Sequence, residues 1–170
     1  TPTACAPLPE INGCPEMGLC REGVIDKNKR FLKLRRKGKG SMTACIFHDT
    51  NPDQQDRRIF DIVEEAYNRR EKVLIFSSDG ERASAIDRLL WIMKQEAFLP
   101  HRIFEKDEPD GDVPIAIVAT EMNPIKATLL VADGHCDLDF ACKFRSIHEF
   151  VIRSTPQLHE ACRERYRQYR

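Results

Sequence analysis

The chain has 170 residues with 27 basic and 27 acidic side chains, so its formal net charge is zero. This length supports one domain, or one domain with a small appendage, and the balanced charge excludes a general electrostatic attraction to nucleic acid. The sequence contains no apolar run of the roughly 20 residues that a membrane-spanning helix needs, and its first residues lack the pattern of a secretory signal.

The cysteine content favours a reducing compartment. The chain has seven cysteines, an odd number, and four of them lie in or beside predicted strands and helices: Cys45, Cys136, Cys142 and Cys162. These four lack the regular spacing of a disulfide framework, which favours free thiols. We therefore expect a cytoplasmic protein.

Residues 1–41 differ in composition from the rest of the chain. They carry nine basic and four acidic side chains, whereas residues 42–170 carry 18 and 23. Residues 23–34 are compatible with a small hairpin around Lys27-Asn28, and residues 35–41 are typical of a flexible basic linker. We therefore divide the chain into an irregular N-terminal extension, residues 1–41, and an α/β domain, residues 42–170.

Three cysteines fall within the extension, at Cys5, Cys14 and Cys20. A structural zinc site usually has four ligands, paired two to four residues apart. The wider spacing here matches that pattern poorly, so we expect neither a bound metal nor another cofactor.

The extension ends directly before Met42. The sequence Lys37-Gly38-Lys39-Gly40 back-translates to purine-rich codons, as a ribosome-binding site in front of a start codon would. We therefore hypothesise that translation starts at Met42 and that residues 1–41 are not native. Mass spectrometry of the native protein tests this hypothesis, because a peptide from before Met42 would contradict it.

From Met42 onward, strand and helix patterns alternate. Helical spacing of apolar residues is clearest at Ile59, Ile62 and Val63, and the continuous apolar run 72–77 is typical of a strand buried on both faces. The predicted strands are 43–48, 72–77, 114–119, 127–132 and 149–153. The predicted helices are 53–70, one that follows a cap at Ser78 or Asp79, a short one near 138–144 and a last one from Pro156 onward. This alternation predicts an α/β fold of three layers with a mostly parallel sheet of about five strands.

Sheets of this kind often bind nucleotides, but the turns after the strands give little support for that function. No glycine-rich phosphate loop follows the first strand. Residues 77–80 could bind a phosphate at a helix start, although an ordinary cap is the commoner role for such residues. The neighbours His135 and Cys136, like His48 and Asp49, are adjacent in sequence, whereas a nucleophile and its base must converge in space. These patterns favour a non-catalytic protein.

The last predicted helix has two different faces. Thr155 fits an N-cap and Pro156 the first helical position. One face is mostly apolar, and the other consists of His159, Arg163, Tyr166, Arg167 and Arg170. Arginine forks beside an aromatic ring suit a ligand that carries carboxylates and an apolar side chain. A solvated amphipathic helix is the alternative interpretation.

Residues 42–170 resemble the chi subunit family of bacterial DNA polymerase III, whose members are accessory proteins of the clamp loader. Four stretches carry the resemblance: Glu71-Lys72-Val73-Leu74-Ile75, Leu90-Trp91 followed by Phe98-Leu99-Pro100-His101, the strands 114–119 and 127–132 as a pair, and residues 163–170. The last stretch and the spacing of Trp91 from Phe98 are the specific parts. Residues 1–41 have no counterpart in the family.

The resemblance implies a Rossmann-like fold without nucleotide chemistry. It also implies a protein that connects the clamp loader, through the psi subunit, to the acidic C-terminal tail of single-stranded DNA-binding protein. The tail-binding pocket of the family lies along the last helix and the strand before it. It carries over to Val151 or Ile152 as an apolar wall, and to Arg163, Tyr166 and Arg167 on the helix. His159 stands where the family tends to have a lysine, which makes one contact weaker or dependent on pH.

The resemblance assigns a second contact region to Trp91, Phe98 and Pro100. In the family this region meets the psi subunit, or an iron–sulfur helicase that competes for the same surface. Core packing is the alternative for these aromatic residues. Two other function classes stay open: an enzyme or nucleotide-binding protein on a Rossmann-like fold, and a nucleic-acid-binding module built on the basic N-terminal arm. We expect neither sequence-specific binding to nucleic acid nor a membrane contact.

Overall fold

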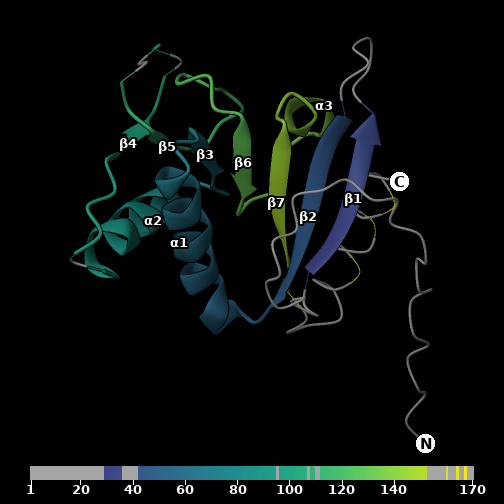
Figure 1. Cartoon of the computed structure of the whole chain (residues 1–170), viewed down its shortest axis with the longest axis horizontal. Helices are drawn as coiled ribbons and strands as arrows, with labels where there is room; N and C mark the ends of the chain where they lie inside the picture. The colour runs from purple at the N-terminus through teal and green to yellow at the C-terminus, as the bar shows by residue number, and fades with distance from the viewer. Residues whose placement is uncertain are drawn as a thin grey trace, which may run out of the picture.

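The computed structural model describes residues 29–35, 42–94, 96–106, 108, 109 and 112–152, together with Glu160, Glu164 and Arg167. Within these residues the chain forms a seven-stranded sheet in the order β1-β2-β7-β6-β3-β5-β4, with helices packed on its faces (Figure 1). The strands are β1 (Lys29–Arg35), β2 (Met42–Thr50), β3 (Val73–Phe76), β4 (His101–Phe104), β5 (Ile115–Val118), β6 (Leu129–Ala132) and β7 (Ser146–Ile152). The helices are α1 (Pro52–Asn68), α2 (Gly80–Ile92) and α3 (Leu138–Ala141).

The strands from β2 to β4 along the sheet are parallel, which confirms the predicted α/β fold with a mostly parallel sheet. β1 is the exception, because it pairs antiparallel with β2 over its whole length. Residues 29–34 of the expected hairpin lie in β1 and pair with β2, and residues 23–28, which would complete the hairpin, lie outside the described residues.

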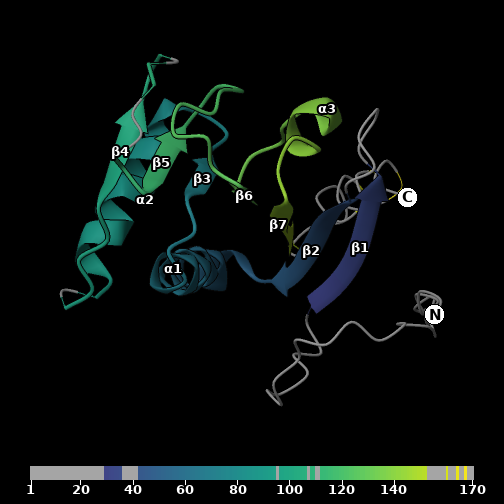
Figure 2. The same cartoon turned by 45° about the horizontal axis from the view of Figure 1, so that its top comes forward.

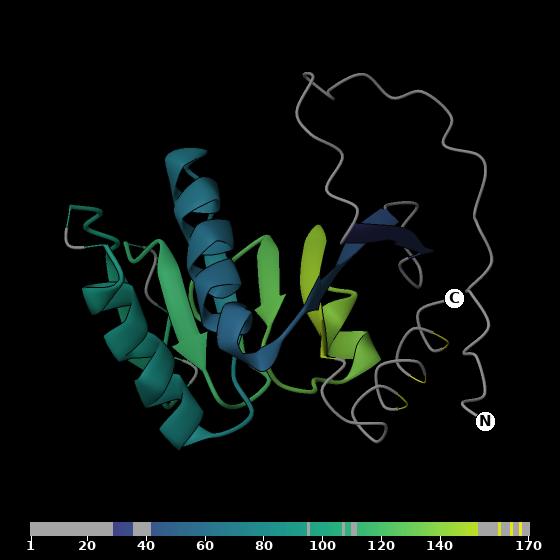
Figure 3. The ribbon, with the colours of Figure 1, turned by 90° about the horizontal axis from the view of Figure 1, so that it is seen from below.

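Apolar side chains form one packed layer on each face of the sheet, between the strands and the segments that cover them. On one face, α1 and α2 pack their buried stripes against alternate residues of the central strands, among them Val73, Ile75 and Ile117. On the other face, α3 and the segment before β6 cover Leu74, Phe76 and their neighbours. Figure 2 shows α1 and α3 on opposite sides of β7, and Figure 3 shows α1 lying across the sheet. The three layers that the alternation of strands and helices predicts are present.

The pairing expected between strands 114–119 and 127–132 is wrong. The corresponding β5 and β6 do not touch each other, because β3 lies between them and pairs with both. The connection from β5 to β6 crosses β3 on the face that α3 covers, where Ile125 and Ala127 are buried. The error has a physical cause: all three strands are apolar throughout, so the sequence pattern carries no information on their order.

Helix α2 begins where a cap was expected. The side chain of Asp79 accepts a hydrogen bond from the backbone N–H of Arg82 (2.7 Å), which satisfies one of the free donors at the helix start. This hydrogen bond and that from the Ser78 hydroxyl lower the pKa of the Asp79 carboxyl. In the part of the chain that the structure describes, no helix is both long and apolar enough to cross a bilayer.

Candidate functional site

The C-terminal end of α2 exposes large apolar side chains. The helix buries Ala83, Ile86 and Leu90 at helical spacing, so that the next two positions, Trp91 and Ile92, turn away from the sheet. Trp91 is 51% exposed and Ile92 is 71% exposed. A helix that ends against the core would normally bury such residues, which makes their exposure informative.

The loop from α2 to β4 adds a third apolar side chain. Phe98 is 66% exposed, and its ring centroid lies 5.7 Å from that of Trp91. The neighbouring Leu99 is buried in the layer beneath α2 and anchors the loop. We call the exposed group of Trp91, Ile92 and Phe98 the Trp91–Phe98 surface. Pro100, which the sequence groups with these residues, is half-buried beside it.

Charged groups border the Trp91–Phe98 surface. Lys94 forms an ion pair with Glu64 of α1, with 2.6 Å between Nζ and Oε1. Arg88, which precedes Trp91 in sequence, and Glu96, which lies between Trp91 and Phe98, are both exposed. An apolar centre with a polar rim is the usual composition of a protein–protein contact, and exposed aromatic residues are enriched at such contacts.

A second region lies at the carboxyl ends of β3 and β6, where ligands bind in open α/β sheets. Here Asp133, only 3% exposed, receives two hydrogen bonds from Arg82: Nε lies 2.8 Å from Oδ2 and Nη2 lies 2.9 Å from Oδ1. Gln55 donates to Oδ1 of the same carboxylate at 2.7 Å, and Asp56 accepts from Arg82 Nη2 at 2.6 Å. The hydrogen bond to Asp133 is the main cause that raises the pKa of Arg82, and Asp56 adds to it against the opposing effect of burial.

Backbone groups also fill this region at the carboxyl ends of β3 and β6, which we call the crevice. The N–H groups of Asp133 and Gly134 both donate to the carbonyl of Phe76, at 2.9 and 3.0 Å. A Cβ atom added to Gly134 would lie 2.6 Å from the backbone nitrogen of Ser78 and 2.8 Å from the carbonyl carbon of Ser77. The turns after β3 and β6 therefore touch, and backbone groups fill the space between them.

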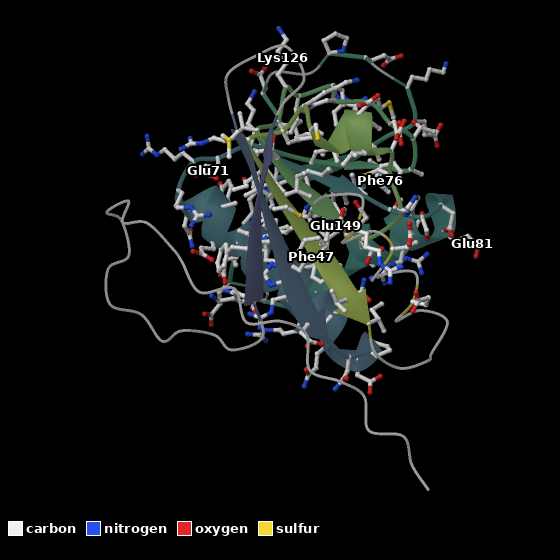
Figure 4. All side chains as sticks on the ribbon, turned by 90° about the vertical axis from the view of Figure 1, so that its right-hand side faces the viewer. Phe47, Glu71, Phe76, Glu81, Lys126 and Glu149 are labelled. Atoms are coloured by element: carbon white, nitrogen blue, oxygen red, sulfur yellow. The ribbon has the colours of Figure 1, made fainter. Side chains whose placement is uncertain are left out.

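The third region is β7, which contains two of the expected tail-binding residues. Val151 packs against the apolar layer on the α3 face, whereas Ile152 points to the other face because successive strand residues alternate. Only one of the two can therefore line a given pocket. Glu149 is buried on the same face as Val151, directly beside Phe47 of β2 (Figure 4).

The terminal helix is described at three positions. Glu160, Glu164 and Arg167 are helical and exposed, and Arg167 Nη1 lies 3.1 Å from Glu164 Oε2 and 3.7 Å from Glu160 Oε1. The other expected tail-binding residues lie outside the described residues: His159, Arg163, Tyr166 and Arg170. The weak zinc candidates Cys5, Cys14 and Cys20 lie outside them as well. Among the residues that are described, no three His, Cys, Asp or Glu side chains gather closely enough to hold a metal ion.

The sequence does not reveal a contact between the buried His48 and the half-buried His148. Nε2 of His48 on β2 lies 2.9 Å from Nδ1 of His148 on β7, and the two rings stack with centroids 5.0 Å apart. Burial, followed by the charges of His48, Lys29 and Arg69, lowers the pKa of His148 to about 3. One ring nitrogen of His48 thus contacts a residue 100 positions away, and no local sequence signal could identify that partner.

Comparisons with known proteins agree on one family. The family model of the DNA polymerase III chi subunit, HolC, matches residues 42–170. The chain is 28% identical over 116 residues to DNA polymerase III subunit chi of Escherichia coli (strain K12), which covers 68% of this chain and 78% of that protein. It is also 28% identical over 109 residues to DNA polymerase III subunit chi of Pseudomonas aeruginosa, covering 64% and 74%.

One solved structure supports the fold at low sequence identity. The crystal structure of the DUF1998 helicase MrfA bound to DNA matches with a TM-score of 0.54 and 13% identity. The match covers 75% of this chain but only 22% of the helicase chain. At this identity the likeness concerns the arrangement of strands and helices and nothing else.

Proposed function

The chain belongs to the DNA polymerase III chi subunit family, and from this we propose that it is a non-catalytic accessory subunit that connects two partners during DNA replication in the cytoplasm. One partner is the clamp loader, through its psi subunit, or a helicase that competes for the same surface. The other is the acidic C-terminal tail of single-stranded DNA-binding protein. The chain itself then neither reads a DNA sequence nor contacts a membrane.

The observation that carries this proposal is the Trp91–Phe98 surface. Exposed apolar side chains normally lower solubility, so a contiguous group with ordered ring contacts indicates a face that another protein covers. We assign the psi subunit or the helicase to this face, with Trp91, Phe98 and Pro100 in the contact. Lys94, Glu96 and Arg88 would lie at its rim, where charges affect the association rate more than the affinity.

The tail of single-stranded DNA-binding protein is assigned to the end of β7 and the terminal helix. Several acidic residues that end in a free carboxylate suit guanidinium forks beside an apolar notch. Arg167 is exposed, and its ion pairs to Glu160 and Glu164 are solvent-exposed contacts, which cost little to exchange for a ligand carboxylate. One of Val151 and Ile152, together with His159, Arg163, Tyr166 and Arg170, completes the proposed site.

The alternative of a nucleotide-binding or hydrolytic enzyme is less well supported. Ligands of Rossmann-like enzymes bind at the carboxyl ends of the strands, and there Arg82, Asp133 and Gln55 satisfy one another. A phosphate would have to displace the Asp133 carboxylate from Arg82 and would meet its negative charge. The closed contacts at the ends of β3 and β6 therefore disfavour a phosphate there, and the thermal-shift screen below tests the cavity of about 600 Å³ that remains at the ends of β4 and β5.

The test measures both contacts on one preparation. Binding of the purified psi subunit is followed by calorimetry, and binding of a labelled acidic tail peptide by fluorescence anisotropy. Phe98→Ala should abolish or strongly weaken the first contact and leave the second unchanged. Arg163→Ala and Arg167→Ala should have the reverse effect, and each should weaken peptide binding by roughly 1.5–3 kcal/mol, the range for hydrogen bonds to charged groups.

Two matched variants control for surface changes. Phe31→Ala removes a phenylalanine that is 67% exposed on β1, at the opposite edge of the sheet from β4. Arg57→Ala removes an exposed arginine of α1 that pairs with Asp61. Wild-type affinity for both partners is expected in these two controls. Nucleotide binding in a thermal-shift screen, or peptide binding that survives both arginine substitutions, would overturn the proposal.

A further inference from the structure

His101 is buried directly beneath the Trp91–Phe98 surface. It is the first residue of β4, and its side chain has no solvent exposure although β4 is an edge strand of the described sheet. Nδ1 of the ring lies 2.6 Å from the carbonyl oxygen of Leu99. Nε2 lies 3.2 Å from the carbonyl oxygen of Asp87 and 3.3 Å from its carboxylate Oδ1.

The two acceptors of His101 belong to the two segments that present the exposed rings. Asp87 lies on α2 one helical turn before Trp91, so the pair occupies the same side of the helix. Leu99 directly follows Phe98 in the loop. The imidazole therefore joins the helix that carries one exposed aromatic residue to the loop that carries the other.

The rings themselves form a continuous row. The imidazole centroid of His101 lies 4.8 Å from that of Trp91, with 51° between the ring planes. Trp91 in turn lies 5.7 Å from Phe98 at 59°. Both separations fall within the range of favourable aromatic contacts. Trp91 is thus held between a buried ring and an exposed one.

We propose that His101 is the positioning residue of the Trp91–Phe98 surface: its two hydrogen bonds fix the loop against α2 and its ring supports Trp91 in the orientation that a partner binds. This inference rests on the proposed function, in which that surface contacts the psi subunit. It assigns a role to a residue that would not itself touch the partner.

The chemistry of the site explains why a histidine suits it. All the oxygen atoms around the ring are acceptors, and the two ring nitrogens point toward them in different directions. The neutral ring donates to one of them, and the protonated ring donates to both. A phenylalanine has the planar shape but no donors. Asparagine and glutamine each offer a donor at only one of the two places, near Nδ1 and Nε2 respectively. Comparing histidine, phenylalanine, asparagine and glutamine at position 101 therefore distinguishes the effect of the ring from the effect of each hydrogen bond.

A surface whose side chains are already ordered in the free protein binds its partner more tightly. If Trp91 and Phe98 are already held in place, the partner does not have to immobilise two large side chains and a loop when it docks. Removing both hydrogen bonds should therefore weaken binding by about tenfold, mostly through faster dissociation. The shape of the exposed residues themselves would remain unchanged.

Trp91 is the one tryptophan of the chain, so intrinsic fluorescence reports on this surface without any partner. The experiment compares wild type with His101→Phe, His101→Asn and His101→Gln, using Trp91 emission, its quenching by acrylamide, thermal melts and calorimetry with purified psi subunit. We expect His101→Phe to shift emission to longer wavelength, to increase quenching and to weaken psi binding about tenfold. His101→Asn and His101→Gln each keep one hydrogen bond but lose the ring beneath Trp91, so both should also shift emission and increase quenching. The change should be smaller for His101→Asn, because the contact to Leu99 is the shorter one.

The outcomes separate this inference from the proposed function. A folded His101→Phe protein with wild-type emission, quenching and psi affinity overturns the positioning role. A variant set that melts at lower temperature but keeps wild-type emission and affinity shows a purely structural role and overturns it too. If His101→Phe does not fold, the order of emission and quenching in the Asn and Gln variants decides. Changes in Trp91 fluorescence without any psi binding by wild type would support the positioning role and contradict the proposed partner.

Discussion

The two ends of α2 differ in whether their side chains have partners within the protein. At the N-terminal end, Arg82, Asp133 and Gln55 satisfy one another inside a crevice. At the C-terminal end, Trp91 and Ile92 expose apolar surface beside Phe98. Trp91 lies nine positions after Arg82 on the helix, about 14 Å at the rise of an α-helix.

The difference separates side chains that satisfy one another from side chains that expose apolar surface. In nucleotide-binding proteins with this kind of sheet, the carboxyl ends of the strands hold the ligand. Here protein groups close the part of that edge at the ends of β3 and β6, so this part contributes to stability. The ends of β4 and β5 line a cavity of about 600 Å³ with the start of α2, and the opposite end of α2 exposes apolar side chains. Substitutions in the crevice should therefore change folding, and substitutions on the Trp91–Phe98 surface should change association.

The largest effect is expected from Asp133→Ala. The change leaves the Arg82 guanidinium and the Gln55 amide without their shared acceptor in a mostly buried place, and breaking a buried ion pair costs about 3–5 kcal/mol. Because Arg82 keeps its contact with Asp56, we expect a value near the lower end of that range. Urea unfolding of the two proteins measures the difference.

The control for this variant is Asp61→Ala, which removes an exposed ion pair with Arg57. It should change the free energy of unfolding by less than about 1 kcal/mol. Asp133→Ala with an equally small loss would show that the crevice is not a stabilising element. Restored stability in a double variant, Arg82→Met with Asp133→Leu, would in turn support the ion pair as the cause.

Gly134→Ala should have the next largest effect. The added methyl group would lie within 3 Å of the backbone of Ser77 and Ser78, which can move only if the turn after β3 moves. Overpacking of this kind costs about 1–3 kcal/mol. The matched control is Gly80→Ala, where an added Cβ meets no described atom within 4 Å and alanine favours the helix. Equal melting temperatures of the two variants would contradict close contact between the turns.

Acid should destabilise the protein through His48 and His148, which lie on β2 and β7 and not at either end of α2. The folded-state pKa of His148 is about 3 and its ordinary value is 6.5, so between these values the unfolded chain binds more protons. Stability is therefore complete above about pH 6.5 and falls as the pH drops, by about 1.5 kcal/mol between pH 6.5 and 5. Urea unfolding at several pH values measures this slope, and His148→Gln should flatten it. An unchanged slope in that variant would assign the acid sensitivity to other groups.

Local patterns predict the elements of this fold well and their arrangement poorly. The stripe that contains Ile59, Ile62 and Val63 predicts α1 because a helix places such positions on one face, and Asp79 is identifiable as a cap from its place before α2. The order β6-β3-β5 is not predictable, since all three strands are uniformly apolar.

The candidate sites show the same division. Trp91 is predictable as an exposed residue because the positions before it fill the buried stripe of α2. The contact of Arg82 with Asp133 spans 51 residues, and that of His48 with His148 spans 100. Ion pairs and hydrogen bonds between distant residues leave no periodic signal, so only the folded arrangement brings these groups together.

The smallest effect on stability is expected from Phe98→Ala, and it tests the contrast most directly. Phe98 is 66% exposed, so the substitution removes little buried area and should change the free energy of unfolding by no more than about 0.5 kcal/mol. Phe60 of α1 has no exposed surface, and Phe60→Ala should cost about 3–5 kcal/mol by the same measurement because it opens a cavity in the core. The two substitutions remove the same atoms, which makes their difference a measure of burial alone. A loss of 2 kcal/mol or more for Phe98→Ala would place Phe98 in the core and remove the reason to assign a partner to this end of α2.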